Sequence, residues 1–139
     1  MINHALKGKK VLVTGATGFI GGRLAERLAK EEGAIVTGTG RNLEAAPHVA
    51  EAGVTLVKAD LLDEDAMRVA MQDQEVVFHV AAWLGRHGGE QSAYALNVAA
   101  TALAVRLAAE AGVKRFVQTS SIAAYGKPNP VPCDPGPTL

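Results

Sequence analysis

The chain has 139 residues, a length that fits one domain and buries roughly two-thirds of the surface that the unfolded chain exposes. It carries 14 basic and 14 acidic side chains, and this neutral balance lacks the positive field of nucleic-acid binders. No apolar run is long enough to span a bilayer, and the first residues lack the apolar core of a signal peptide. We therefore expect no nucleic-acid partner, no membrane partner and a cytoplasmic location.

Short apolar runs alternate along the chain with segments of helical period. The first half predicts a strand at 10–14, a helix from 19 to a capping Gly33, a strand at 34–38, a helix at 42–52 interrupted by Pro47, and a strand at 54–58. The second half predicts a helix that opens on acidic residues 63–65, a strand at 76–82, a helix at 92–111 and a strand at 113–119. Five strands that alternate with helices predict an α/β fold.

The order of these elements also predicts how the strands pair. Strands joined by helical crossovers run parallel, and right-handed crossovers produce a doubly wound sheet. We therefore expect a Rossmann-like domain at residues 1–127 with five strands in the order 3-2-1-4-5. Five of the six prolines lie between Pro128 and Pro137, which predicts an extended or disordered tail at 128–139. The single Cys133 lies in that tail without a neighbouring histidine, so we expect no metal site.

Three glycines follow the first predicted strand and open the first predicted helix. In a dinucleotide site Gly15 permits a tight turn, Gly18 lets backbone N–H groups approach a pyrophosphate, and Gly21 allows close packing of helix and sheet. The amino end of the helix then faces the anion. Alternatively, these glycines only shape a turn between strand and helix. Their spacing and their position favour a nucleotide site.

Several motifs, in this order, resemble those of the extended short-chain dehydrogenases/reductases, the NAD(P)-dependent epimerase/dehydratase relatives. They are Thr14-Gly-Ala-Thr-Gly-Phe-Ile-Gly21, Ala59-Asp60-Leu61, His79-Val80-Ala81-Ala82, Asn97-Val98-x-x-Thr101, and Gly112-Val-Lys-Arg-Phe-Val117 followed by Ser120-Ser121-x-x-x-Tyr125-Gly126. The resemblance covers residues 9 to 127. It departs from the family pattern at Ala100, where a glycine is usual.

This resemblance implies a nicotinamide dinucleotide as cofactor and a small-molecule substrate with a carbonyl or hydroxyl group. The residues that we expect to bind the cofactor are Gly15, Thr17, Gly18, Phe19, Ile20, Gly21, Arg41, Asp60, Leu61, Val80, Ala81 and Ala82. Asp60 would accept a hydrogen bond from the adenine amino group, or alternatively cap the following helix. His79 is expected to be buried and hydrogen-bonded rather than catalytic.

Two residues after the second strand bear on the choice between NAD and NADP. Relatives that prefer NAD place an aspartate where this chain has Gly40, and Arg41 offers a forked cation suited to a 2′-phosphate. The alternative is an ordinary solvated surface arginine. Position and the missing acid favour NADP over NAD.

Ser121 is the expected catalytic residue, because in relatives this serine polarises the substrate oxygen. Its usual partners, a tyrosine and a lysine in Tyr-x-x-x-Lys, are missing: Val98 follows Tyr94 by four residues and Asn129 follows Tyr125 by four. The chain resembles the first half of an enzyme whose C-terminal substrate domain is missing. We therefore expect it to be inactive alone, and its last strand to be an open edge that belongs to a longer protein or pairs in a homodimer.

Three functional hypotheses remain. The preferred one is the cofactor half of an NADP-dependent oxidoreductase that acts on a carbonyl or hydroxyl group. The others are a stand-alone NADP-binding or sensing module without catalysis, and a structural domain that binds no nucleotide. Among the catalytic options, a nucleotide-sugar epimerase or dehydratase ranks lower, because such enzymes more often carry the acid that Gly40 replaces.

Overall fold

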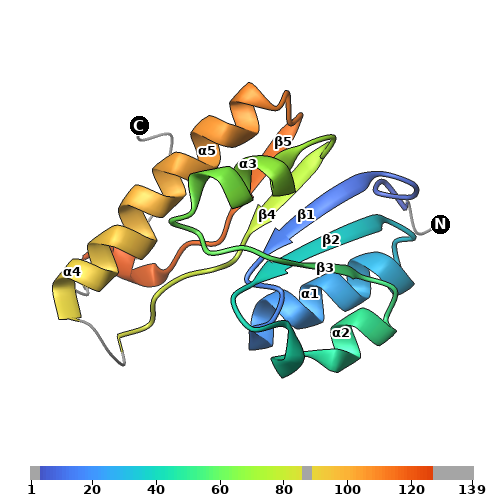
Figure 1. Ribbon diagram of the computed structural model, residues 1–139, viewed down its shortest axis with the longest axis horizontal. Helices are drawn as coiled ribbons and strands as arrows, with labels where there is room; N and C mark the ends of the chain where they lie inside the picture. The colour runs from blue at the N-terminus through green and yellow to red at the C-terminus, as the bar shows by residue number, and fades with distance from the viewer. Residues whose placement is uncertain (1–3, 86–88, 127–139) are drawn as a thin grey trace.

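The computed structural model describes residues 4–85 and 89–126. They form a parallel five-stranded sheet in the order β3-β2-β1-β4-β5 with helices on both faces (Figure 1). The first elements are β1 (Lys10–Thr14), α1 (Phe19–Lys30), β2 (Ile35–Gly40), a 3-10 turn (Leu43–Ala45), α2 (Pro47–Glu51), β3 (Thr55–Lys58) and α3 (Glu64–Met71). Then come β4 (Val76–His79), α4 (Gly89–Tyr94), a π-helical segment (Ala95–Ala99), α5 (Ala100–Glu110), β5 (Arg115–Gln118) and a 3-10 turn (Ile122–Tyr125).

This architecture confirms the predicted fold class and strand order, with some differences in the bounds of the elements. The predicted helix at 42–52 is two short pieces, because Pro47 lacks the N–H that a continuous helix requires and begins α2 instead. β2 continues to Gly40, two residues beyond its predicted end. The tail predicted at 128–139 lies outside the described residues.

Two apolar layers hold the helices on the sheet. α1 and α2 cover one face, where Leu28 and Val49 pack with Val11 and Val13 of β1. α3 and α5 cover the other face around Leu12, which belongs to the same strand. Side chains of a strand alternate between the two faces, so a central strand that is buried on both sides is apolar throughout. β1 is therefore the centre of the molecule.

A long apolar helical segment lies over the sheet beside β4 and β5. The segment Gly89–Glu110 has 22 residues, and its most apolar 18-residue window has a mean hydropathy of 1.3. By length and composition alone it could span a membrane, whereas from the sequence we expect no apolar run of that length. Its residues Ala104 and Leu107 are nevertheless buried against the sheet, and Arg106 forms an ion pair with Glu64 of α3 at 2.9 Å. The segment is a covering layer of this fold and does not by itself indicate a membrane span.

β5 lies at the edge of the sheet, as the sequence predicts. Its side chains are exposed except for the half-buried Phe116. An edge strand leaves backbone N–H and C=O groups without partners in the sheet. Pairing of this edge with a second copy stays a prediction, which size-exclusion chromatography would test.

A buried hydrogen-bond chain fixes the carboxyl edge of the central strands. The Thr14 hydroxyl accepts from the backbone N–H groups of Val80 and Ala81 at 3.2 and 3.3 Å and lies 2.9 Å from His79 Nδ1. With both lone pairs occupied, this hydroxyl donates its proton to Nδ1. His79 therefore carries its own proton on Nε2, which donates to the Thr101 hydroxyl at 3.3 Å.

These hydrogen bonds also explain why β4 ends at His79 rather than at residue 82, the end that the sequence predicts. The N–H groups of Val80 and Ala81 bind a side chain of β1 instead of continuing the ladder between strands. His79 is fully buried, and burial lowers its pKa, which keeps the ring neutral at neutral pH. β1, β4 and α5 are thereby fixed to one another at a single point.

We expect Thr14→Val to lower the free energy of unfolding by about 1–3 kcal/mol. The substitution keeps the shape of the side chain but leaves two backbone N–H groups and His79 Nδ1 without their partner. Urea unfolding measures the loss. The matched control is Thr55→Val on the exposed start of β3, which we expect to change stability by less than about 0.5 kcal/mol. Equal effects of the two substitutions would contradict this account.

Candidate functional site

A cleft of about 920 Å³ opens at the carboxyl ends of the strands. After β1 the chain passes to α1 on one face of the sheet, and after β4 it passes to α5 on the other face. Ligands of doubly wound sheets bind at this kind of divergence between two central strands. All the predicted site residues line the cleft: Gly15, Thr17, Gly18, Phe19, Ile20, Gly21, Arg41, Asp60, Leu61, Val80, Ala81, Ala82 and Ser121.

The glycine turn is built by two close contacts between backbones. Gly15 has φ +72°, and a Cβ there would lie 2.9 Å from the Cα of Ala81. A Cβ on Gly21 would overlap the carbonyl oxygen of Gly15. A side chain at Gly21 would push α1 away from the turn, and a side chain at Gly15 would push the turn away from the segment that follows β4, so packing requires both glycines. The contacts thus support the explanation that these glycines shape the turn, and pyrophosphate binding at the turn stays a prediction.

The amino end of α1 offers its first backbone N–H groups to the cleft. Gly18 is the N-cap residue, it provides no capping side chain, and the first turn contains no acidic residue. Phe19 is 96% exposed and Ile20 is 63% exposed, which leaves two large apolar side chains uncovered beside the turn. A helix amino end without a cap or an acid fits a pyrophosphate, and apolar walls fit the rest of a dinucleotide.

The end of β2 forms the side of the cleft where an adenosine ribose would lie. A Cβ on Gly40 would overlap the side chain of Thr17, so an aspartate does not fit at this position unless Thr17 moves. The Arg41 side chain is exposed and forms no hydrogen bond or ion pair with any residue between 4 and 85 or between 89 and 126. This side of the cleft therefore presents an unneutralised guanidinium and no carboxylate on β2.

The two aspartates after β3 have different contacts. Asp63 accepts from the backbone N–H of Ala66 at 3.0 Å and caps α3. Asp60 accepts from the N–H of Leu62 at 2.9 Å through one carboxylate oxygen, which stabilises the turn before the helix. The alternative role of Asp60 as the helix cap is thus wrong. Its other oxygen retains the capacity to accept a hydrogen bond from a ligand.

The far end of the cleft holds Ser121, at the start of the final 3-10 turn. Its Oγ accepts from the backbone N–H of Ala123 at 3.2 Å, so the hydroxyl proton is left to donate elsewhere. Ala81 and Ala82, which follow β4 after Val80, have small side chains that leave space between Ser121 and the glycine turn. This arrangement allows a hydroxyl donor to meet a ligand that extends along the whole cleft.

Asn97 is a site residue that the sequence identified only as part of a motif. Its side-chain amide accepts from the backbone N–H of Trp83 at 2.8 Å and donates to the Trp83 carbonyl at 3.1 Å. Asn97 therefore fixes the segment after Ala82 as a wall of the cleft. Gln118 and Thr119 also line the cleft, and no sequence signal marks them. Within the described part of the chain, no cluster of three or more His, Cys, Asp or Glu side chains is arranged to hold a metal ion.

Comparison with known proteins agrees with this geometry. The model of the NAD dependent epimerase/dehydratase family matches residues 11–138. Similar curated proteins include 2-alkyl-3-oxoalkanoate reductase of Shewanella oneidensis, which is 35% identical over 119 residues that make up 84% of this chain and 30% of that protein. Cinnamoyl-CoA reductase 1 of Petunia hybrida is 39% identical over 134 residues, 91% of this chain and 39% of that protein.

Solved structures show the same fold. Pen from Bacillus thuringiensis has a TM-score of 0.76 at 27% identity, covering 86% of this chain and 40% of its own. A short-chain dehydrogenase/reductase superfamily protein from Agrobacterium tumefaciens with bound NAD has a TM-score of 0.71 at 28% identity, covering 84% of this chain and 34% of its own.

The sequence studied spans well under half the length of these relatives. The matched part contains the sheet, the glycine turn and the cleft. The family model covers most of the 139 residues, and the motifs that suggested the resemblance, from Thr14 to Gly126, all lie within this match. The chain therefore belongs to the NAD-dependent epimerase/dehydratase family.

Proposed function

We propose that this chain is the NADP-binding part of an oxidoreductase that reduces a small-molecule carbonyl or oxidises the corresponding hydroxyl. The observation that carries the preference for NADP is the pair Gly40 and Arg41 at the end of β2. Gly40 has no side chain to meet a ribose hydroxyl, and Arg41 presents a guanidinium to the same side of the cleft. A guanidinium binds the oxygens of a phosphate in a forked geometry, whereas NAD offers only a hydroxyl there.

The other cleft residues receive their roles from their positions. The backbone of Gly15–Gly21 would hold the pyrophosphate, Thr17 would lie beside the ribose, and Asp60 with Leu61 would contact the adenine. Val80, Ala81 and Ala82 would leave room for the nicotinamide half. The bound cofactor would supply the hydride, while the Ser121 hydroxyl would donate a hydrogen bond to the substrate oxygen and polarise it.

Several similar proteins are named as reductases or dehydrogenases, and this favours reduction of a carbonyl over sugar epimerisation as the reaction of the whole protein. Among them are the 2-alkyl-3-oxoalkanoate reductase and the cinnamoyl-CoA reductase, and also 3 beta-hydroxysteroid dehydrogenase/Delta 5-->4-isomerase of Mycobacterium tuberculosis at 33% identity. UDP-glucose 4-epimerase of Mycolicibacterium smegmatis, at 33% identity over 134 residues, keeps the epimerase as a second candidate. Binding of UDP-sugars together with NAD in preference to NADP would favour that second candidate. A cytoplasmic location likewise stays a prediction from composition.

Arg41→Ala should weaken NADPH binding about tenfold or more and change NADH binding little, because only NADPH carries the phosphate that the guanidinium would contact. Calorimetric titration of the 139-residue chain with both cofactors measures the two affinities. Arg115→Ala is the matched control, since it removes the same charge at the amino end of β5, away from the cleft. An equal loss for the two cofactors would refute the assignment of Arg41.

We expect the 139-residue chain to bind NADPH without oxidising it. Neither Tyr94 nor Tyr125 is followed four residues later by a lysine, so the pair that moves the proton in relatives is not provided. The measurement is NADPH absorbance over time with a 3-oxo ester, with a full-length cinnamoyl-CoA reductase and its own substrate as the positive control. Steady oxidation by the short chain would mean that another side chain donates the proton.

A further inference from the structure

We propose that Lys58, at the end of β3, is a second determinant of cofactor specificity and contacts the 2′-phosphate together with Arg41. This inference rests on the proposed binding of NADP. It assigns to a residue of the neighbouring strand a role that no motif in the sequence suggests.

The register places Lys58 directly beside Gly40. These two residues are paired in the parallel ladder of β2 and β3, and Ala59 N–H donates to the Gly40 carbonyl at 3.1 Å. A Cβ on Gly38 would lie 3.0 Å from the Leu56 side chain, so Gly38 and Leu56 point to the same face of the sheet. Side chains alternate along a strand, so Lys58 shares that face with the missing side chain of Gly40.

The face in question is the one on which Thr17 lies, because a Cβ on Gly40 would overlap the Thr17 side chain. Lys58 thus extends from β3 on the same side of the sheet as the glycine turn. Its backbone flanks the cleft, whose lining includes the next three residues of the chain, Ala59, Asp60 and Leu61. A lysine side chain is long and flexible enough to reach across one strand spacing of about 4.8 Å.

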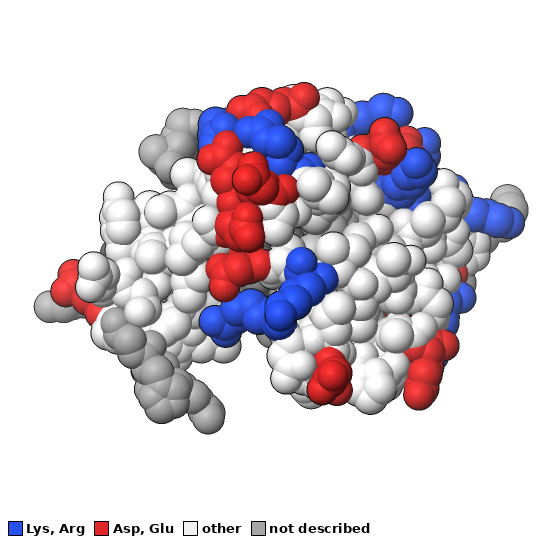
Figure 2. All heavy atoms as spheres, viewed as in Figure 1, with Lys and Arg blue, Asp and Glu red and all other residues white. Residues whose placement is uncertain are grey.

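Lys58 and Arg41 are both available to a ligand. Neither forms an ion pair or a hydrogen bond with another described residue, whereas Lys9 and Lys114 share the carboxylate of Glu75. Asp60 and Asp63, which follow Lys58 in the chain, accept from the backbone N–H groups of Leu62 and Ala66, and neither forms an ion pair with Lys58. On the side of the molecule turned to the viewer, Figure 2 shows a group of blue basic atoms near the middle, beneath a run of red acidic atoms.

A 2′-phosphate carries close to two negative charges at neutral pH, so a single guanidinium does not neutralise it. An ammonium group on the adjacent strand supplies the second charge and adds a donor to a remaining phosphate oxygen. A ribose hydroxyl carries no charge and gains little from either cation. Two cations on neighbouring strands therefore discriminate between NADP and NAD more strongly than one.

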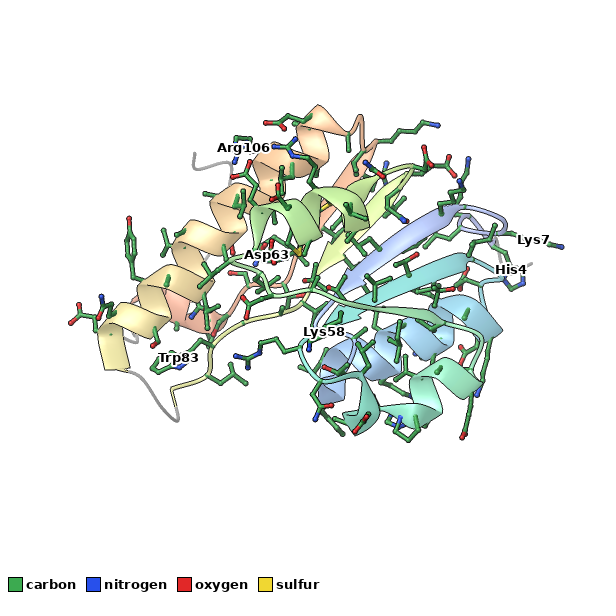
Figure 3. All side chains as sticks on the ribbon, viewed as in Figure 1. His4, Lys7, Lys58, Asp63, Trp83 and Arg106 are labelled. Atoms are coloured by element: carbon green, nitrogen blue, oxygen red, sulfur yellow. The ribbon has the colours of Figure 1, made fainter. Side chains whose placement is uncertain are left out.

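The test compares two small ligands that differ only in the phosphate, adenosine 2′,5′-bisphosphate and adenosine 5′-monophosphate. In calorimetric titrations of the 139-residue chain, we expect Lys58→Gln to weaken the bisphosphate about tenfold and the monophosphate less than about twofold. Lys58→Arg should retain most of the preference. Lys7→Gln is the matched control, because Figure 3 shows Lys7 and Lys58 at opposite ends of the sheet, and it should leave both affinities unchanged.

The outcomes separate this inference from the proposed function. Suppose that the wild-type chain prefers the bisphosphate, that Arg41→Ala removes this preference and that Lys58→Gln leaves it unchanged. The role of Lys58 is then refuted, and NADP binding stands. If the wild-type chain binds both ligands equally, the NADP preference fails and the role of Lys58 fails with it. If Lys58→Gln weakens both ligands equally, Lys58 is no specificity determinant. Circular dichroism checks that each variant is folded.

Discussion

The close approach of α1 to the sheet is the constraint on which the rest of the structure depends. Gly15 passes the backbone of Ala81, and Gly21 stands against the carbonyl of Gly15, where side chains would collide. Because β1 is buried on both faces, it cannot shift to relieve such a collision. The position of the helix amino end, and with it the shape of the cleft, follows from these two contacts.

The hydrogen-bond chain from Thr14 to Thr101 stabilises the same region from the other face. A neutral, buried His79 whose tautomer is fixed by its partners links β1, β4 and α5 without placing a charge in the core. Its effect on the site is indirect: the Thr14 hydroxyl that donates to His79 also accepts from the backbone N–H groups of Val80 and Ala81, which line the cleft after β4. The buried His79 therefore has a structural role, because its hydrogen bonds hold Thr14 of β1 and Thr101 of α5 beside β4.

The charge at the end of the cleft beside β2 comes from residues near the ends of two strands. Gly40 and Arg41 are adjacent in sequence, but Lys58 meets them only through the parallel register of β2 and β3. The missing carboxylate on β2 agrees with the two cations, which have no ion-pair partner among the described residues, since each feature favours an anionic group at this point. Specificity for a cofactor would then depend on Gly40, Arg41 and Lys58 together rather than on one residue.

The fold class, the strand order and many of the residues that line the cleft could be predicted from the amino-acid sequence. Apolar runs, glycines and their spacing are local features, and a parallel sheet brings the ends of its strands to one edge whatever the details. Only contacts between elements decided where β4 ends, because Thr14 of β1 accepts from the N–H groups that follow β4. They also decided that Lys58 stands beside Gly40 and that Asn97 fixes the Trp83 segment. Such pairings join residues far apart in the chain, and only packing and register bring them together.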